Sequence, residues 1–167
     1  LVGANIQVTR DFNATQGIFD SDGFDVDVND DLIVGAGGAI ILGTTGSATV
    51  AGDVDLTGSI SDGAGLTMDD TSAAILKGTV SMPLTVTKNA VGTTVTLSGT
   101  ATATGLTINT GTVDTSGSNY NLDVNGNLDL QASSVLTANA SDINISGNLL
   151  LNGGTFNVNT CEVIYDG

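Results

Sequence analysis

A nine-residue unit recurs through this chain, with the form apolar-x-apolar-x-Gly-x-apolar-x-apolar. It occurs with a central glycine at 48–56, 122–130 and 143–151, and at 26–34 with Asp30 in the place of the glycine. Looser relatives start at Leu66, Leu84 and Leu106. Alternating apolar and polar residues are typical of a strand with one buried face. Each unit therefore predicts two short strands, and we expect the central glycine to bend the chain between them with a positive φ.

The spacing of the units predicts how these strands are arranged. The second apolar residues of successive units lie 16 to 22 residues apart; they are Val28, Val50, Met68, Val86, Ile108, Val124 and Ile145. A period of about 20 residues is typical of solenoids, in which each coil buries its apolar face only by stacking on its neighbours. The sequence predicts an all-β fold, a parallel β-solenoid (β-helix) of about seven to eight coils over residues 20–167. Residues 1–19 would be a strand-like extension or a first irregular coil, and Val50, Val124 and Ile145 are expected in the core.

An antiparallel β-sandwich is the alternative fold. It also has many short strands with turn signals every 8–12 residues. The pair Asn125-Gly126 is suited to a two-residue hairpin turn. The recurrence of one unit in the same phase favours the solenoid.

The composition agrees with a chain that has almost no helix. The 167 residues include 18 acidic residues, all Asp except Glu162, only three basic residues and no His. Asp, Asn, Gly, Ser and Thr, which prefer turns and strands, replace the usual helix formers. A net charge of −15 excludes nucleic acid as an expected partner. No apolar run approaches about 18 residues, so we expect no transmembrane segment.

Acidic residues are the main candidates for chemistry. Asp20, Asp22 and Asp25 surround a glycine turn in a way that resembles part of a calcium loop, so they are the candidate calcium ligands. We expect no other cofactor. Paired acids such as Asp69 and Asp70 suit a glycosidase, but the chain has only three cations to hold an anionic sugar. We therefore expect no enzymatic activity.

Strand-like segments also occupy the two ends of the chain. Ile6 and Val8 alternate with polar residues near the start, and Val163 and Tyr165 do so near the end. Neither segment has the polar or helical character of a solenoid cap, so both are expected to be assembly residues. The partners would be copies of the chain, in a polymer, or flanking repeats of a larger protein. This predicts a structural subunit of an extracellular filament, sheath or surface stalk, assembled by end-to-end stacking or strand addition.

The units Leu122–Leu130 and Ile143–Leu151, with the closing segment 153–167, resemble repeats of secreted bacterial β-helix proteins. These are the filamentous-haemagglutinin-like and autotransporter-like surface fibre proteins. The resemblance implies export to the cell surface or the extracellular space and a role in rods, stalks or adhesion. It also supplies the alternative function, an adhesin or passenger segment of a larger autotransporter-like protein. The family shares no catalytic residue that maps onto this chain.

Overall fold

The alternating segments form strands throughout a computed structural model that describes residues 5–89 and 92–167. Its strands are β1 (Ile6–Val8), β2 (Phe12–Asp20), β3 (Val26–Val28), β4 (Leu32–Ile41), β5 (Ser47–Val50), β6 (Val54–Ser61), β7 (Gly65–Met68), β8 (Ala74–Thr87), β9 (Thr94–Asp114), β10 (Leu122–Val124), β11 (Leu128–Gln131), β12 (Ser134–Thr137), β13 (Asp142–Ile145), β14 (Leu149–Asn152), β15 (Thr155–Asn157) and β16 (Glu162–Tyr165). The described residues contain no helix, as expected from the composition. They therefore offer no helix that is long and apolar enough to cross a membrane.

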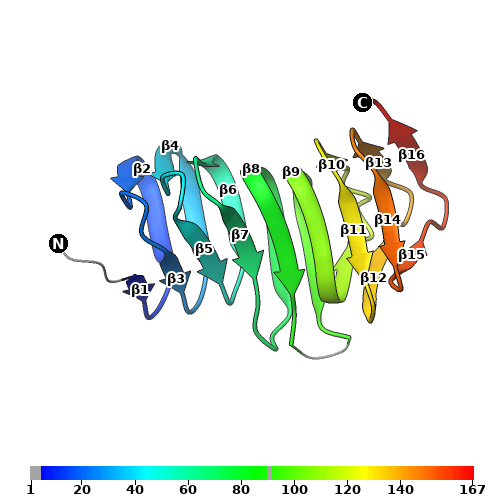
Figure 1. Cartoon of the computed structure of the whole chain (residues 1–167), viewed down its shortest axis with the longest axis horizontal. Coiled ribbons are helices and arrows are strands. Elements are labelled where there is room, and N and C mark those ends of the chain that lie inside the picture. Colours follow the sequence, from blue (N-terminus) through cyan, green and yellow to red (C-terminus); the bar gives the residue numbers. More distant parts are fainter. Residues whose placement is uncertain (1–4, 90–91) are drawn as a thin grey trace.

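All pairings between these strands are parallel, and each joins one turn of the chain to the next. Figure 1 shows the strands side by side along a rod, with the two termini at opposite ends. The coils contain about 21 residues and number about eight. The prediction of a parallel β-solenoid is confirmed, and the parallel pairing excludes the antiparallel sandwich.

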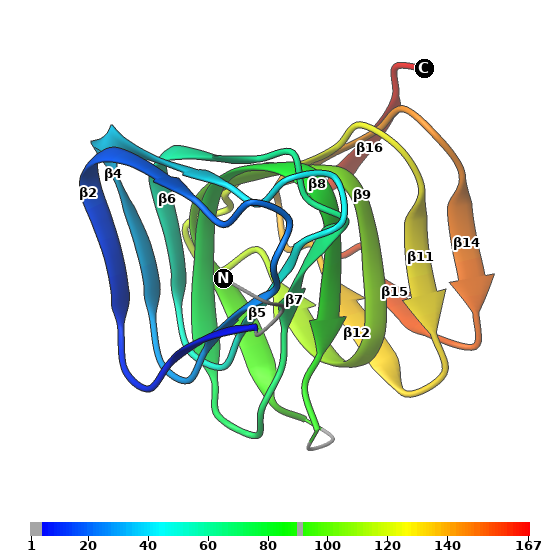
Figure 2. The ribbon, with the colours of Figure 1, turned by 60° about the vertical axis from the view of Figure 1, so that its left-hand side comes forward.

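One face of the rod is built from strands that pair in register from the first coil to the last, and the two corners beside it are named by their position relative to this face. Face A consists of β1, β3, β5, β7, residues 84–86 of β8, residues 106–108 of β9, β11 and β14. The exit corner is the set of residues that directly follow face A, such as 29–31, 51–53, 69–72 and 88–89. The entry corner is the set of residues that directly precede face A, such as 22–25, 42–46, 125–127 and 146–148. The other strands return the chain to face A, and Figure 2 shows β8 and β9 curving around the rod as they do so.

The core consists of columns of apolar side chains that run along the rod. In one column of face A, each residue pairs in register with the next and is at most 1% exposed; its members are Val28, Val50, Met68, Val86, Ile108 and Leu130. Successive members lie 18 to 22 residues apart. Each coil is therefore buried by the coils on both sides, which is the physical reason for the repeat.

Val124 and Ile145 are buried as predicted, but they belong to a different column. They stack on Ala103 in the return strands, not on face A. The unit at 48–56 bends around the exit corner, whereas the units at 122–130 and 143–151 bend around the entry corner. The prediction that all units share one phase was therefore wrong. A strand–bend–strand pattern suits either corner, so the pattern alone does not specify which one it occupies.

The central glycines of the units do not have the positive φ that was predicted for them. Gly52, Gly126 and Gly147 are absent from the glycines that have positive φ. A Cβ atom on Gly126 would lie 2.2 Å from the backbone oxygen of Thr104 in the preceding coil. Glycine is therefore needed at this corner because stacked backbones approach closely, and not because of a left-handed conformation.

Side-chain oxygens of Asp and Asn continue the hydrogen bonding where the chain turns. Each accepts a hydrogen bond from a backbone N–H one coil further on, at 2.8–3.2 Å. We call these residues the inter-coil acceptors: Asp25, Asp31, Asp53, Asn119, Asn121 and Asn127. Their role explains why Asp and Asn are abundant, because the backbone donors at a turn need acceptors that the strands do not supply.

The segment before residue 20 is part of the same stack. β1 pairs in register with β3, and β2 pairs with β4, with a bulge between Ala14 and Gln16. Residues 6–20 thus form the first coil of the described rod.

Candidate functional site

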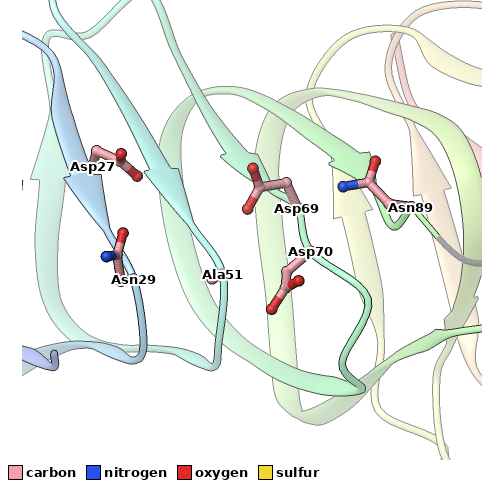
Figure 3. Close-up of a pocket in the computed structure, with 6 residues that line it drawn as sticks. All are labelled: Asp27, Asn29, Ala51, Asp69, Asp70 and Asn89. Carbon is pink, nitrogen blue, oxygen red and sulfur yellow. The ribbon is translucent and has the colours of Figure 1, made fainter. Parts of the chain in front are cut away.

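A polar hollow lies at the exit corner of the rod. Its lining residues come from four consecutive coils and are Asp27, Asn29, Ala51, Asp69, Asp70 and Asn89. Figure 3 shows them in sequence along the rod, on or just after the strands of face A. Turn-forming Asp and Asn collect here because each coil changes direction at the same place. Asp70 has a φ of 74°, a conformation that Asp tolerates better than most residues.

A fully buried lysine ties these coils together. Lys88 precedes Asn89 and has none of its surface exposed. Its ammonium group donates hydrogen bonds to the backbone oxygen of Ala51, at 3.1 Å, and to that of Asp69. Lys88 thus links three coils through two carbonyl groups that belong to residues of the hollow.

Burial and charge shift two pKa values at this corner. Burial lowers the pKa of Lys88, although the nearby carboxylates of Asp69 and Asp70 act in the opposite direction. Burial also raises the pKa of Asp69, against the effect of the Lys88 charge and together with the repulsion from Asp27 and Asp70. The lining is acidic, and Ala51 is its one apolar residue among those described. The hollow therefore suits a cation or a hydroxyl-rich group and not an apolar organic ligand.

Of the three predicted calcium ligands, Asp20 and Asp22 line one hollow, whereas Asp25 is bonded to the next coil. Asp20 Oδ1 accepts the backbone N–H of Asp22 at 2.9 Å within the local turn. Asp25 Oδ1 instead accepts the N–H and the hydroxyl of Ser47 in the next coil, at 2.9 and 2.8 Å. Asp20 and Asp22 line a second hollow beside Thr44 and Thr45, and Asp25 is not among its lining residues.

The carboxylates that do gather are Asp11, Asp30 and Asp31. Over residues 5–89 and 92–167 they are the one group whose ligand atoms all lie within 4.8 Å of one another. Partial desolvation and repulsion by Asp31 and Asp11 raise the pKa of Asp30. Exposed acids also gather without an ion, so the cluster alone does not define a metal site. The sequence pattern does not indicate this cluster, because Asp11 and Asp30 belong to different coils.

The predicted assembly residues lie at opposite ends of the rod. Ile6 and Val8 are half-buried in the first coil, and Val163 is half-buried in the last coil. Tyr165 is 62% exposed. Leu151 and Val158 were not predicted as assembly residues, but they are 56% and 47% exposed in the last coil. The signal for Leu151 was present, because it is the final apolar residue of the unit at 143–151.

Comparison of the chain with protein-family models, with curated proteins and with solved structures finds no match in any of the three. The resemblance to bacterial surface fibre proteins thus depends on the style of the repeats alone.

Proposed function

We propose that this chain is a structural subunit of an extracellular filament, sheath or surface stalk. The solenoid serves as the rod, and the coils at its ends join those of neighbouring subunits or flanking repeats. The observation that carries the proposal is the set of apolar columns, which continue through the rod and become exposed at the last coil. The extracellular location follows from the resemblance of the repeats to exported surface proteins.

The distribution of charge favours joining through the ends over joining side by side. Most of the 18 acidic residues lie between the first and the last coil, along the sides of the rod, and the chain has a net charge of −15. Two such rods repel each other laterally unless salt or cations screen the charge. The last coil instead exposes apolar side chains, including Leu151 and Tyr165.

Negative-stain microscopy and sedimentation of the purified chain test this proposal. Fibres with an axial repeat near one rod length, about 40 Å for eight coils spaced by about 4.8 Å, would support it. Sedimentation should then show species that grow with protein concentration. A chain that remains a single particle at high concentration would contradict the self-assembling form of the proposal.

A second candidate function is an adhesin or passenger segment of a larger surface protein. The polar hollow at the exit corner favours it, because a surface ligand with hydroxyl groups would find acceptors there. Binding to a panel of surface glycans distinguishes the two functions. If the chain is an adhesin, it should bind a glycan, and D69A should weaken that binding. If the chain is a structural subunit, it should form fibres, and D69A should leave the fibres unchanged.

A further inference from the structure

We infer that the last coil of one copy receives the first coil of a second copy in a single register, with Leu151 against Val8, Val158 against Phe12 and Tyr165 against Phe19. This inference rests on the proposed function, because it specifies the partner and the alignment of the same rod ends. It defines a head-to-tail contact in which the solenoid continues from one chain into the next.

The exposure of side chains in the last two coils is the first observation. Residues at equivalent positions in the last two coils pair in register: Leu130 with Leu151, Ala138 with Val158, and Ile145 with Tyr165. In each pair the first residue is fully buried and the second is about half exposed or more, at 56%, 47% and 62%. The difference arises because a further coil covers the first residue of each pair. Among the described residues, no coil covers Leu151, Val158 or Tyr165.

The first coil carries matching apolar residues in the same three columns. Followed through the paired strands, the columns of Leu151 and Tyr165 begin at Val8 and Phe19. The column of Val158 passes through Ala138 and the buried Thr115, and the hydrogen bond from the Thr112 N–H to the Thr93 oxygen aligns Thr115 with Leu97, whose column begins at Phe12. All three side chains are only partly buried and pack against the core from one side. The rings of Phe12 and Phe19 meet edge to face, with centroids 4.9 Å apart. An aromatic ring such as that of Tyr165 would extend this pair.

The backbone hydrogen-bonding groups of the last coil and of the first coil also match. β14, β15 and β16 each pair with a strand on one side only within the described residues. In the entry corner, Asn127 Oδ1 accepts the N–H of Asn148 at 2.9 Å. Asn148 holds the same corner position in the last coil, and Asn5 holds it in the first. Continuing the stack would therefore bring the Asn148 amide oxygen to the Asn5 N–H of the next copy.

These requirements select a second copy over an unrelated partner. A partner must offer strand edges at the same positions around the coil, with apolar side chains at each inward position. A flat apolar patch on a globular protein would cover Leu151 but would leave three strand edges without partners. The first coil of this chain satisfies both conditions at once.

Disulfide trapping tests the register directly. Gln7 and Leu150 point outward at equivalent positions of face A, so the predicted contact makes them partners on adjacent strands. Adjacent strands lie about 4.8 Å apart, within the Cα separation of about 4.4–6.8 Å that a disulfide spans. In a C161S background, which removes the one native cysteine, Q7C/L150C should form a ladder of disulfide-linked multimers. The rod ends lie far apart in one chain (Figure 1), so each such link joins two chains.

The matched control moves one cysteine to a different part of the first coil. Asn13 is exposed on β2, away from face A, and N13C/L150C should give no ladder. Fibres in which Q7C/L150C does not cross-link, or cross-links no better than N13C/L150C, would overturn the register while the proposed function stands. A chain that forms neither fibres nor cross-links would overturn both.

A substitution at the contact provides an independent test. L151D places a carboxylate where the next coil would bury it, and should lower the fibre fraction by about tenfold or more. I18D is the control, because Ile18 is 72% exposed but lies outside the three columns. Circular dichroism verifies that both variants fold. Equal loss of fibres in I18D, or no loss in L151D, would contradict the inferred contact.

Discussion

The exit corner and the entry corner of the later coils satisfy the same kind of backbone donor with different residues. At both corners the chain leaves a strand, and a backbone N–H of the next coil needs an acceptor. The exit corner uses the carboxylates of Asp31 and Asp53. The entry corner of the later coils uses the neutral amide of Asn127, beside Gly126.

This difference shows that the rod needs an oxygen at a given position and does not need its charge. The charged corner brings acids from several coils together, including Asp69 and Asp70, and the buried ammonium of Lys88 bonds to its backbone carbonyls. The entry corner of the later coils, at residues 125–127 and 146–148, contains no acidic residue, and its coils stack with glycine at the closest approach. Stability should therefore depend on pH at one corner and on space at the other.

The largest effect is expected from filling the space at the entry corner. G126A would place a Cβ 2.2 Å from the Thr104 backbone oxygen, which cannot move without shifting a strand. We expect a loss of about 1–3 kcal/mol in the free energy of unfolding, as for overpacked sites. Urea denaturation measures it. G105A is the control, because the nearest atom would lie 3.6 Å away, and equal losses in both variants would contradict this explanation.

A smaller effect is expected from removing an acceptor at the exit corner. Asp53 Oδ1 accepts the N–H of Ile75 at 2.8 Å, and D53A leaves that donor to water. We expect a loss of about 1–2 kcal/mol, whereas D53N keeps an acceptor and should stay within about 0.5 kcal/mol of the native chain. Thermal or urea unfolding of the pair gives the comparison. If D53N is as unstable as D53A, the charge matters and not the acceptor.

The corresponding change at the entry corner should cost less, because both partners there are neutral and exposed. N127A removes the acceptor for Asn148 and should lower stability by about 0.5–1.5 kcal/mol. N127D retains an oxygen at the same place and should behave like the native chain near neutral pH. An amide oxygen and a carboxylate oxygen are interchangeable as acceptors at the two corners only if N127D and D53N are both tolerated.

The smallest expected effect concerns the pH dependence of the exit corner. Burial holds the pKa of Lys88 below its ordinary value of 10.5. Between that lowered pKa and 10.5 the unfolded chain binds a proton that the folded chain has lost, so the contribution of Lys88 to stability rises with pH. The native chain should therefore gain stability relative to K88M as the pH rises from neutral toward 10.5.

Lys77 supplies the control for this measurement. Its ammonium pairs with Asp55 Oδ2 at 2.8 Å, and its side chain is 34% exposed. Stability measured by urea unfolding across the same pH range should show the rise in K77M as in the native chain. A rise that survives in K88M would assign the pH dependence to another group.

The repeat was sufficient to predict the fold, but not the phase of every unit. The column from Val28 to Ile108 follows directly from the spacing of apolar residues. The unit at 122–130 was predicted to have the same phase as the unit at 48–56, but it bends around the entry corner. Its pattern predicts two strands joined by a bend and does not specify which strands of the coil they are. Phase is determined by stacking on the preceding coil, and this information lies in contacts between residues about 21 positions apart.

The features at the corners were still harder to predict. Lys88 carries no motif, and its burial depends on two carbonyl groups that only stacking brings within reach. The hollow likewise joins residues as distant as Asp27 and Asn89. Asp and Asn were correctly expected at turns, but which of them become inter-coil acceptors depends on the register between coils. Local composition thus predicted the type of residue at each corner, whereas the stacking of the coils determined which groups that residue contacts.

The direction of the hydrogen bonds between coils has a mechanical consequence. Because all strands are parallel and stack along the rod, the bonds that join them point along its length. A pull on the ends of the rod loads these bonds coil by coil, so that the terminal coil detaches before the interior. A coil of about 21 residues occupies about 4.8 Å of the rod but reaches roughly 70 Å when extended. Each detached coil would therefore release slack and absorb work, so the rod would lengthen under tension without breaking.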